Sequence, residues 1–185
     1  ETKKQTEVLT QSLVPLVHSA PKTKTQITLL RAHHFSKIPK VGSLINFDVP
    51  MSTSMYHPFV VEWVVARKHN PKYKPVILVI NVPANKGDLL CVGCPMVYHC
   101  TANHQRTFRV GPRTDWAFER LDQNQIQSQS EVILAPGVFQ VTGSGRFMAR
   151  DINDMNQYGL GWYTNVVNGN IPPNKMVQCV FVDVL

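Results

Sequence analysis

Four potential metal ligands lie close together in the middle of the chain. The stretch from Cys91 to His104 has the spacing C-x2-C-x4-H-x4-H. Two thiolates and two imidazoles can complete the tetrahedral coordination of a zinc ion. This spacing makes Cys91, Cys94, His99 and His104 a candidate zinc set.

The same spacing resembles the retroviral-type zinc knuckle, C-x2-C-x4-H-x4-C, with His104 in the last position. Such knuckles bind single-stranded nucleic acid. However, Pro95 and Tyr98 occupy positions where that family has small glycines. The other interpretation is a core strand over residues 89–100, in which cysteine behaves as a small hydrophobic residue. We favour the core strand, expect no metal or other cofactor, and keep the zinc site as the alternative.

Sequence patterns typical of enzymes are missing. None of the seven histidines forms an H-x-H or H-x-D pair, and the chain has no phosphate-binding loop and no G-x-S-x-G elbow. Gly143-Ser-Gly145 is too short for a dinucleotide fingerprint and is interpreted as a turn. Glu62 could be a functional carboxylate, but a glutamate on the surface of a sheet is the more common case. We therefore expect that the chain is not an enzyme.

Basic residues predominate, with a formal net charge of +7 over 185 residues. Residues 8–47 contain no acidic residue, and the loop 67–74 gathers further cations. Such segments neutralise phosphates in nucleic-acid-binding proteins, although a solvated, irregular leader has the same composition. The candidate nucleic-acid-binding residues are Lys22, Lys24, Arg31, Lys37, Lys40, Arg67 and Lys68.

Short apolar runs separated by Gly, Pro and Asn predict about eight to ten strands. The last run, residues 176–185, is apolar on both faces, which predicts a strand in the middle of a sheet. One helix is expected, over residues 114–123, because a capping residue precedes apolar residues at helical spacing. The apolar runs from which these strands are expected cover residues 27–31, 41–49, 59–67, 76–82, 89–100, 107–110, 131–134, 138–141, 146–149, 159–169 and 176–185.

This order of elements resembles the single jelly-roll coat protein of a small non-enveloped icosahedral virus. The resemblance is carried by a basic N-terminal segment, eight or so strands, an aromatic strand at 161–167 and an apolar strand at the end. It implies an all-β fold, an antiparallel eight-stranded jelly-roll sandwich with an N-terminal arm and one short helix in a loop. The arm would be residues 1–24 and the shell domain residues 25–185.

The resemblance implies a capsid protein that self-assembles into an icosahedral shell and packages viral RNA or DNA through its basic residues. The partners would be copies of the chain and the genome, with no membrane. The location would be the virion, and the host cytoplasm or nucleus during assembly. The alternative is a viral movement protein or other single-stranded nucleic-acid-binding protein, with or without the zinc-knuckle-like site.

Overall fold

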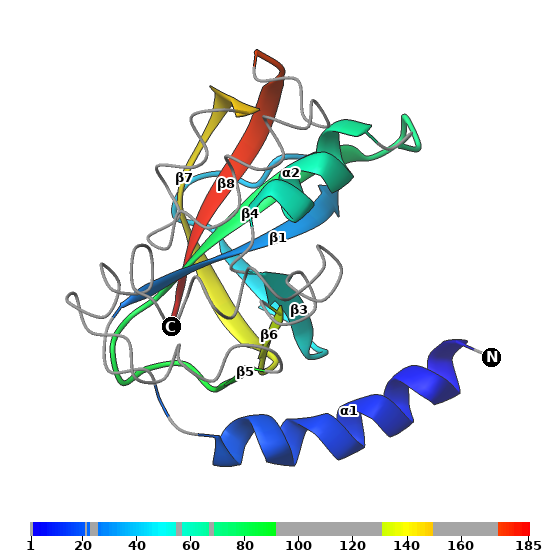
Figure 1. Cartoon of the computed structure of the whole chain (residues 1–185), viewed down its shortest axis with the longest axis vertical. Helices are drawn as coiled ribbons and strands as arrows, with labels where there is room; N and C mark the ends of the chain where they lie inside the picture. The colour runs from blue at the N-terminus through cyan, green and yellow to red at the C-terminus, as the bar shows by residue number, and fades with distance from the viewer. Residues whose placement is uncertain are drawn as a thin grey trace, which may run out of the picture.

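One mixed sheet dominates the structure. The computed structural model describes residues 2–20, 22, 26–54, 57–66, 69–91, 131–149 and 174–185. Within them, eight strands form a sheet in the order β2-β7-β8-β4-β1-β3-β6-β5 (Figure 1). The elements are α1 (Thr2–Ser19), β1 (Ile27–Phe35), β2 (Leu44–Phe47), β3 (Met51–Ser54), α2 (His57–Ala66), β4 (Lys74–Val82), β5 (Leu89–Cys91), β6 (Glu131–Leu134), β7 (Gly137–Met148) and β8 (Met176–Val184).

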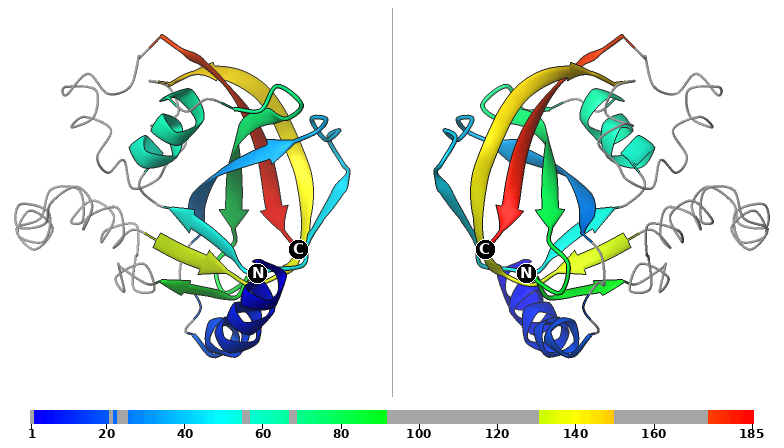
Figure 2. Two further views of the ribbon diagram at one scale, coloured as in Figure 1. Left: turned by 90° about the vertical axis from the view of Figure 1, so that its right-hand side faces the viewer. Right: turned by 90° about the vertical axis from the view of Figure 1, so that its left-hand side faces the viewer.

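The prediction of a mostly β chain is confirmed, but the jelly-roll sandwich is not. A jelly roll is antiparallel throughout, whereas β4 and β8 run parallel at the centre of this sheet, with Ile77 opposite Cys179. The sheet bends strongly between its two ends (Figure 2). Its order therefore differs from the order that the resemblance to a coat protein implies.

The apolar runs of β1, β4 and β8 form the core because both faces of these strands are covered. Leu78 and Ile80 belong to a large cluster on one face, and Ile77 and Val79 belong to a second cluster on the other face. Strands that are buried on both faces read as continuous apolar runs. The prediction that the last strand lies inside the sheet is confirmed, since β8 lies between β7 and β4.

Helix α2 covers the second face and corrects a sequence prediction. Residues 59–67 were expected to form a strand because they are rich in Val and aromatic residues. They form a helix instead, in which Val60, Val61 and Val64 pack into the second cluster. Pro58 stands in the first turn, where a missing N–H costs nothing. Burial of this apolar face has overridden the strand propensity of the valines.

The predicted turn at Gly143-Ser-Gly145 is also wrong. Residues 137–148 form one long strand, β7, and the register against β8 shifts between Val141 and Gly143. The glycines therefore mark an irregularity inside a strand, a common place for glycine. The strands predicted at 107–110 and 159–169 and the helix predicted at 114–123 lie outside the described residues.

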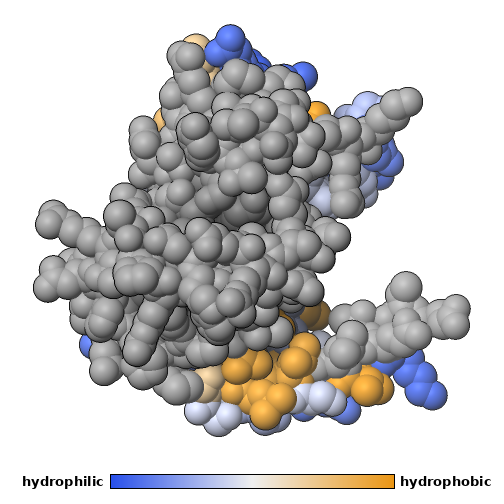
Figure 3. Space-filling model, viewed as in Figure 1, coloured by the Kyte–Doolittle hydropathy of each residue, from blue (hydrophilic) through white to orange (hydrophobic). Residues whose placement is uncertain are grey.

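Helix α1 occupies the segment that was expected to be an irregular arm. It contacts the sheet through β5, and Val17 is its fully buried residue. Val8 and Leu16 remain exposed, and apolar side chains gather where α1 lies, along the lower edge of Figure 3. No helix among the described residues is both long enough and apolar enough to span a membrane.

Candidate active site

Three adjacent strands bring an arginine, a run of hydroxyl side chains and a glutamate together. Leu30 of β1 pairs with Ser54 of β3, and Ser54 pairs with Glu131 of β6. Neighbouring strands lie about 4.8 Å apart, so Glu131 is roughly 10 Å from Leu30 across the sheet. Arg31 follows Leu30 directly, so its side chain leaves β1 on the other face of the sheet, and its guanidinium contacts the β3 backbone at Ser52. This row lies in the half of the sheet formed by β1, β3, β6 and β5 (Figures 1 and 2).

Arg31 offers donors for an anion. One terminal nitrogen, Nη1, donates to the backbone carbonyl of Ser52 at 2.6 Å. Its Nε atom is buried and has no hydrogen-bond partner among the described residues. Burial lowers the pKa of Arg31 below its ordinary value, although the guanidinium stays charged. A charged group with an unused buried donor favours an anionic ligand such as a phosphate or carboxylate.

The Ser52-Thr53-Ser54 run is held in register by its central residue. The Thr53 hydroxyl is buried and donates to the carbonyl of Val132 at 2.6 Å, which ties β3 to β6. Side chains alternate along a strand, so Ser52 and Ser54 share the face of Leu30, whereas Thr53 and Arg31 face the other side. The tie through Thr53 therefore keeps Ser54 opposite Glu131.

Glu131 is the acidic residue in this series of backbone pairs, and it is the first residue of β6. Its backbone is fixed by pairing with Ser54. A carboxylate near bound substrate can stabilise a positive charge that develops in a transition state. The three strands thus carry, at neighbouring backbone positions, a cation that can bind an anion, hydroxyl residues that can donate or accept hydrogen bonds, and an acidic residue.

Two histidines follow Arg31 on β1, on opposite faces of the sheet. His33 lies edge-on to Phe35 and Phe47, at ring separations of 4.7 and 5.5 Å. Burial, with smaller contributions from the positive charges of Arg31 and His34, lowers the pKa of His33 to about 4. His33 is therefore neutral at pH 7.

His34 takes part in a short hydrogen-bond chain to helix α2. Its Nε2 lies 2.9 Å from Nδ1 of His69, and His69 Nε2 lies 2.8 Å from the carbonyl oxygen of Val64. A carbonyl only accepts, so His69 Nε2 must donate and His69 Nδ1 must accept from His34. Both rings also contact Trp63, at 5.2 and 5.4 Å. The chain of hydrogen bonds ties α2 to β1.

The lowered pKa of His33 predicts that acid destabilises the fold. The unfolded chain binds a proton near pH 6.5 and the folded chain only near pH 4, so stability falls as the pH drops through this window. After allowance for solvent screening, we expect a loss of about 2 kcal/mol in the free energy of unfolding. Urea denaturation between pH 7 and 4 should show this loss, and His33→Asn should flatten the slope. An unchanged slope in this variant would assign the acid sensitivity to other groups.

The residues predicted to bind nucleic acid are scattered over the structure. Lys37 and Lys40 are exposed beyond β1, and Arg31 is half-buried and bonded to the Ser52 carbonyl. Lys22 forms an ion pair with Asp88. Lys24, Arg67 and Lys68 lie outside the described residues. The assignment of these residues to nucleic-acid binding stays a prediction.

The candidate zinc ligands fall largely outside the described residues. Cys91 ends strand β5, while Cys94, His99 and His104 are not described. No group of three His, Cys, Asp or Glu side chains that could hold a metal occurs in the described part of the chain. Cys179, the fourth cysteine, is buried in β8, and burial raises the pKa of its thiol to about 12, so this side chain packs as an apolar group.

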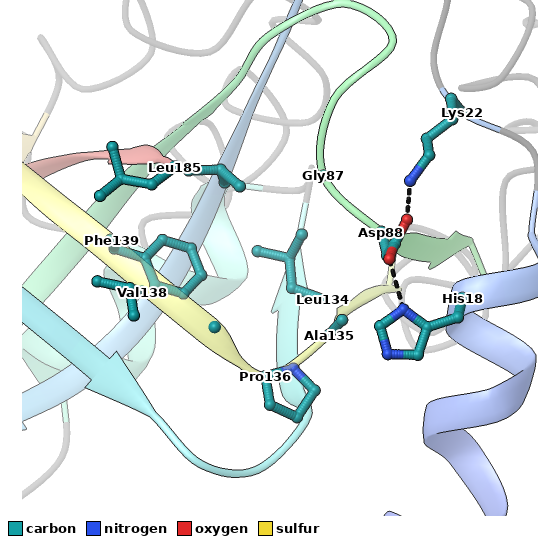
Figure 4. A pocket seen from close by; sticks show the side chains of 12 residues that line it. His18, Lys22, Gly87, Asp88, Leu134, Ala135, Pro136, Val138, Phe139 and Leu185 are labelled. Atoms are coloured by element: carbon teal, nitrogen blue, oxygen red, sulfur yellow. Dashed lines mark hydrogen bonds and ion pairs between the residues drawn. The ribbon is translucent and has the colours of Figure 1, made fainter.

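A cavity of about 200 Å³ lies at the other end of β6 from Glu131 (Figure 4). Its walls combine apolar side chains, Leu134 and Phe139 among them, with polar groups. At its rim, both His18 and Lys22 contact the carboxylate of Asp88. This carboxylate therefore has both of its oxygens engaged, and the group of charges fastens the end of α1 and the residues after it to the β4–β5 connection.

Sequence reasoning missed the serine run and Glu131. The signal for Glu131 was an acidic residue that opens an apolar strand, and the signal for the serines was three consecutive hydroxyl residues, Ser52 to Ser54. Neither is specific by itself, because both patterns are common at strand ends. Only the order β1-β3-β6 brings Arg31, Ser54 and Glu131 together.

Comparisons of the sequence with known proteins assign it to no family. No protein-family model matches it, and no curated protein matches it. Several solved structures have a similar fold. The Vis toxin of Vibrio splendidus, an ADP-ribosyltransferase, is 13% identical with a TM-score of 0.46, over 97% of this chain and 56% of that chain. This chain thus spans little more than half the length of the Vis toxin.

Two further structures are similar at the same level. The catalytic domain of VahC from Aeromonas hydrophila is 12% identical with a TM-score of 0.45, over 97% of this chain and 70% of that chain. The C3larvin toxin of Paenibacillus larvae, also an ADP-ribosyltransferase, is 8% identical with a TM-score of 0.47, over 98% of this chain and 78% of that chain.

These findings correct the functional expectations from the sequence. The Vis, Plx2a and C3larvin toxins are ADP-ribosyltransferases and not coat proteins, and the sheet contains a parallel pair that a jelly roll lacks. The predictions of a capsid protein, of a nucleic-acid-binding alternative and of a chain without enzymatic activity are therefore wrong. The predicted shell and genome partners and the virion location are wrong for the same reason.

Proposed function

We propose that this chain is an ADP-ribosyltransferase, an enzyme that transfers the ADP-ribosyl group of NAD⁺ to an acceptor. The observation that carries the proposal is the pairing of β1, β3 and β6, in which Ser54 pairs with both Leu30 and Glu131, and Arg31 follows Leu30 and bonds to the Ser52 carbonyl. The support comes from the chemistry that these residues of the chain can perform.

Arg31 supplies the contact for the diphosphate of NAD⁺. A guanidinium presents a planar fork of donors that matches two phosphate oxygens, and Nε is an unused donor of that fork. The bond from Nη1 to the Ser52 carbonyl fixes the orientation of the fork before the substrate arrives. Preorganisation of this kind reduces the entropy lost when the ligand binds.

Glu131 supplies the negative charge at the reacting carbon. In the transfer, the bond between C1′ of the ribose and the nicotinamide nitrogen breaks, and its electron pair leaves with neutral nicotinamide. The ribose passes through an oxocarbenium-like state, which a neighbouring carboxylate stabilises. A nucleophilic atom of the acceptor then bonds to C1′ and releases its proton to solvent. In this scheme Ser52 and Ser54 hydrogen-bond to the ribose and hold it beside Glu131.

The N-terminal division predicted from the sequence also enters as a proposal. We propose that residues 25–185 form the catalytic domain and that residues 1–24 form a separate segment attached to it. The support is that α1 docks through buried Val17 and through the contact of His18 with Asp88.

Release of nicotinamide is the direct test of the proposed function. The purified chain is incubated with NAD⁺, with and without a mixture of cellular proteins as acceptors. Nicotinamide is quantified by chromatography. We expect enzyme-dependent nicotinamide release, and addition of 541 Da, the mass of an ADP-ribosyl group, to acceptor proteins by mass spectrometry, as about one group per modified site. The absence of both products at saturating NAD⁺ would overturn the proposal.

A further inference from the structure

A second row of polar side chains crosses the centre of the sheet, away from the proposed active site. Thr28 of β1 pairs with Asn81 of β4, and Asn81 pairs with Asp183 of β8. Asp183 in turn pairs with Gln140 of β7. These four strands are neighbours in the sheet (Figure 1). The register therefore places four polar residues side by side where the flanking positions are apolar.

The row lies on the face that also carries α2. Along β4, Asn81 has the same parity as Ile77 and Val79, which belong to the cluster packed against α2. Along β8, Asp183 has the same parity as Cys179 of that cluster. Side chains two residues apart in a strand share a face. The polar row thus lies beside the apolar cluster under α2, on the same face of the sheet. It is close to the C-terminal ends of β4 and β8.

One hydrogen-bond acceptor of the row is unpaired within the described part of the chain. Oδ1 of Asn81 is buried and has no hydrogen-bond partner among the described residues. In the same part of the chain, both ion pairs involve Asp88 and neither involves Asp183. Thr28 is only 9% exposed. A buried acceptor without a donor is unfavourable, and it indicates a site where a ligand supplies the donor.

An aromatic ring stands next to the row. Phe181 is two residues before Asp183 and shares its face. The Phe181 ring packs edge-on against Phe147 at 5.7 Å, and a Cβ added to Gly143 would come within 3.5 Å of it. A carboxylate, an amide oxygen and an aromatic ring together are the groups that recognise an organic cation, because the ring face attracts positive charge.

The spacing of the residues in the row favours an extended organic cation over a single metal ion as the ligand. The oxygen ligands of Ca²⁺ or Mg²⁺ must all lie within about 2.6 Å of one point. Thr28 and Asp183 are two strand spacings apart, roughly 9.6 Å, which is too wide for one ion. A chain that carries separated N–H donors can span the row and meet each acceptor in turn.

We propose that Thr28, Asn81 and Asp183 form a binding site for an extended organic cation of the polyamine class, with Phe181 at its side. The site stands independently of the proposed transfer reaction, because it uses none of the residues assigned to NAD⁺. The chain carries a formal net charge of +7, so the field of the whole molecule repels such a ligand. Binding must therefore come from local contacts, which makes the test specific.

Isothermal titration of the full chain with spermidine at constant ionic strength tests the site. We expect saturable 1:1 binding, a loss of affinity of at least about tenfold in Asp183→Asn, and a smaller loss in Thr28→Val, since each variant removes one polar contact. Asp48→Asn is the matched control, because Asp48 is an exposed acid beyond β2. This variant should bind spermidine as the unmodified chain does.

Three outcomes would overturn the proposal. The first is no saturable binding of spermidine by the unmodified chain. The second is equal weakening in Asp183→Asn and Asp48→Asn, which would show attraction to acidic residues in general. The third is displacement of spermidine by Mg²⁺ at equal concentration, which would assign the row to a metal. If Asp183→Asn fails to fold, the comparison of Thr28→Val with the control decides.

Discussion

Replacing Glu131 by glutamine is expected to reduce nicotinamide release by on the order of 100-fold to 1,000-fold in kcat. Glutamine keeps the size of the side chain and its hydrogen-bonding capacity but removes the negative charge. The proposed transition state carries positive charge on the ribose, and loss of one preorganised electrostatic partner typically costs about 3–4 kcal/mol. Steady-state kinetics with NAD⁺ measure this effect, and kcat should change far more than KM.

Asp48→Asn is the control for that experiment. It removes one negative charge from an exposed position that is not part of the row across β1, β3 and β6. The kcat of this variant should equal that of the unmodified enzyme. If Glu131→Gln retains full activity and the control behaves as expected, Glu131 does not stabilise the transition state and the assignment of the site fails.

Replacing Arg31 by lysine is expected to raise the KM for NAD⁺ by roughly 10-fold to 100-fold. Lysine keeps the positive charge but lacks the planar fork, so it loses the paired contact with the diphosphate and the fixed orientation given by the Ser52 carbonyl. A hydrogen bond to a charged group is worth about 1.5–3 kcal/mol. The measurement is KM and kcat for NAD⁺, together with the affinity for ADP-ribose by titration.

Arg146→Lys provides the matched control for this second experiment. Arg146 is an exposed arginine on β7, at a distance of several strands from Arg31 in the sheet. Its replacement should leave KM unchanged. A structural role of Arg31 would lower the thermal midpoint of unfolding and leave the affinity for ADP-ribose intact. An unchanged affinity in Arg31→Lys would thus remove Arg31 from the substrate site.

The strands that form the centre of the sheet could be predicted from the sequence because they are apolar on both faces. Residues 76–82 and 176–185 are mainly apolar runs, broken only by Asn81 in the first and by Gln178 and Asp183 in the second, and they became β4 and β8. Such runs have few ways to bury both faces other than as internal strands. The run 131–134 likewise became β6 with the predicted bounds.

Elements whose local signals conflict with their packing were predicted wrongly. Helix α2 is rich in Val, which favours strands when considered alone, and its helical spacing of buried residues appears only against the sheet. Strand β7 contains Gly143 and Gly145, which suggested a turn because glycine is common there. Pairing with β8 along its whole length kept the strand continuous, with a local shift of register.

The sequence by itself determined that this chain is mostly β and that its last strand lies inside a sheet. Those properties follow from local composition, since the apolar side chains must leave water wherever the strand is placed. The strand order and the parallel pairing of β4 with β8 were decided only by the tertiary structure. They depend on contacts between residues far apart in the chain, which no local pattern records.

The candidate site was likewise decided only by the tertiary structure. Arg31, Ser54 and Glu131 are ordinary residues in three unrelated stretches of sequence, and Arg31 was first interpreted as a phosphate contact of a basic arm. Their common position results from pairing of β3 with both β1 and β6. The sequence alone favoured a basic structural protein because the net charge can be counted without knowing the fold. A site depends on which side chains meet, and only the folded sheet decides that.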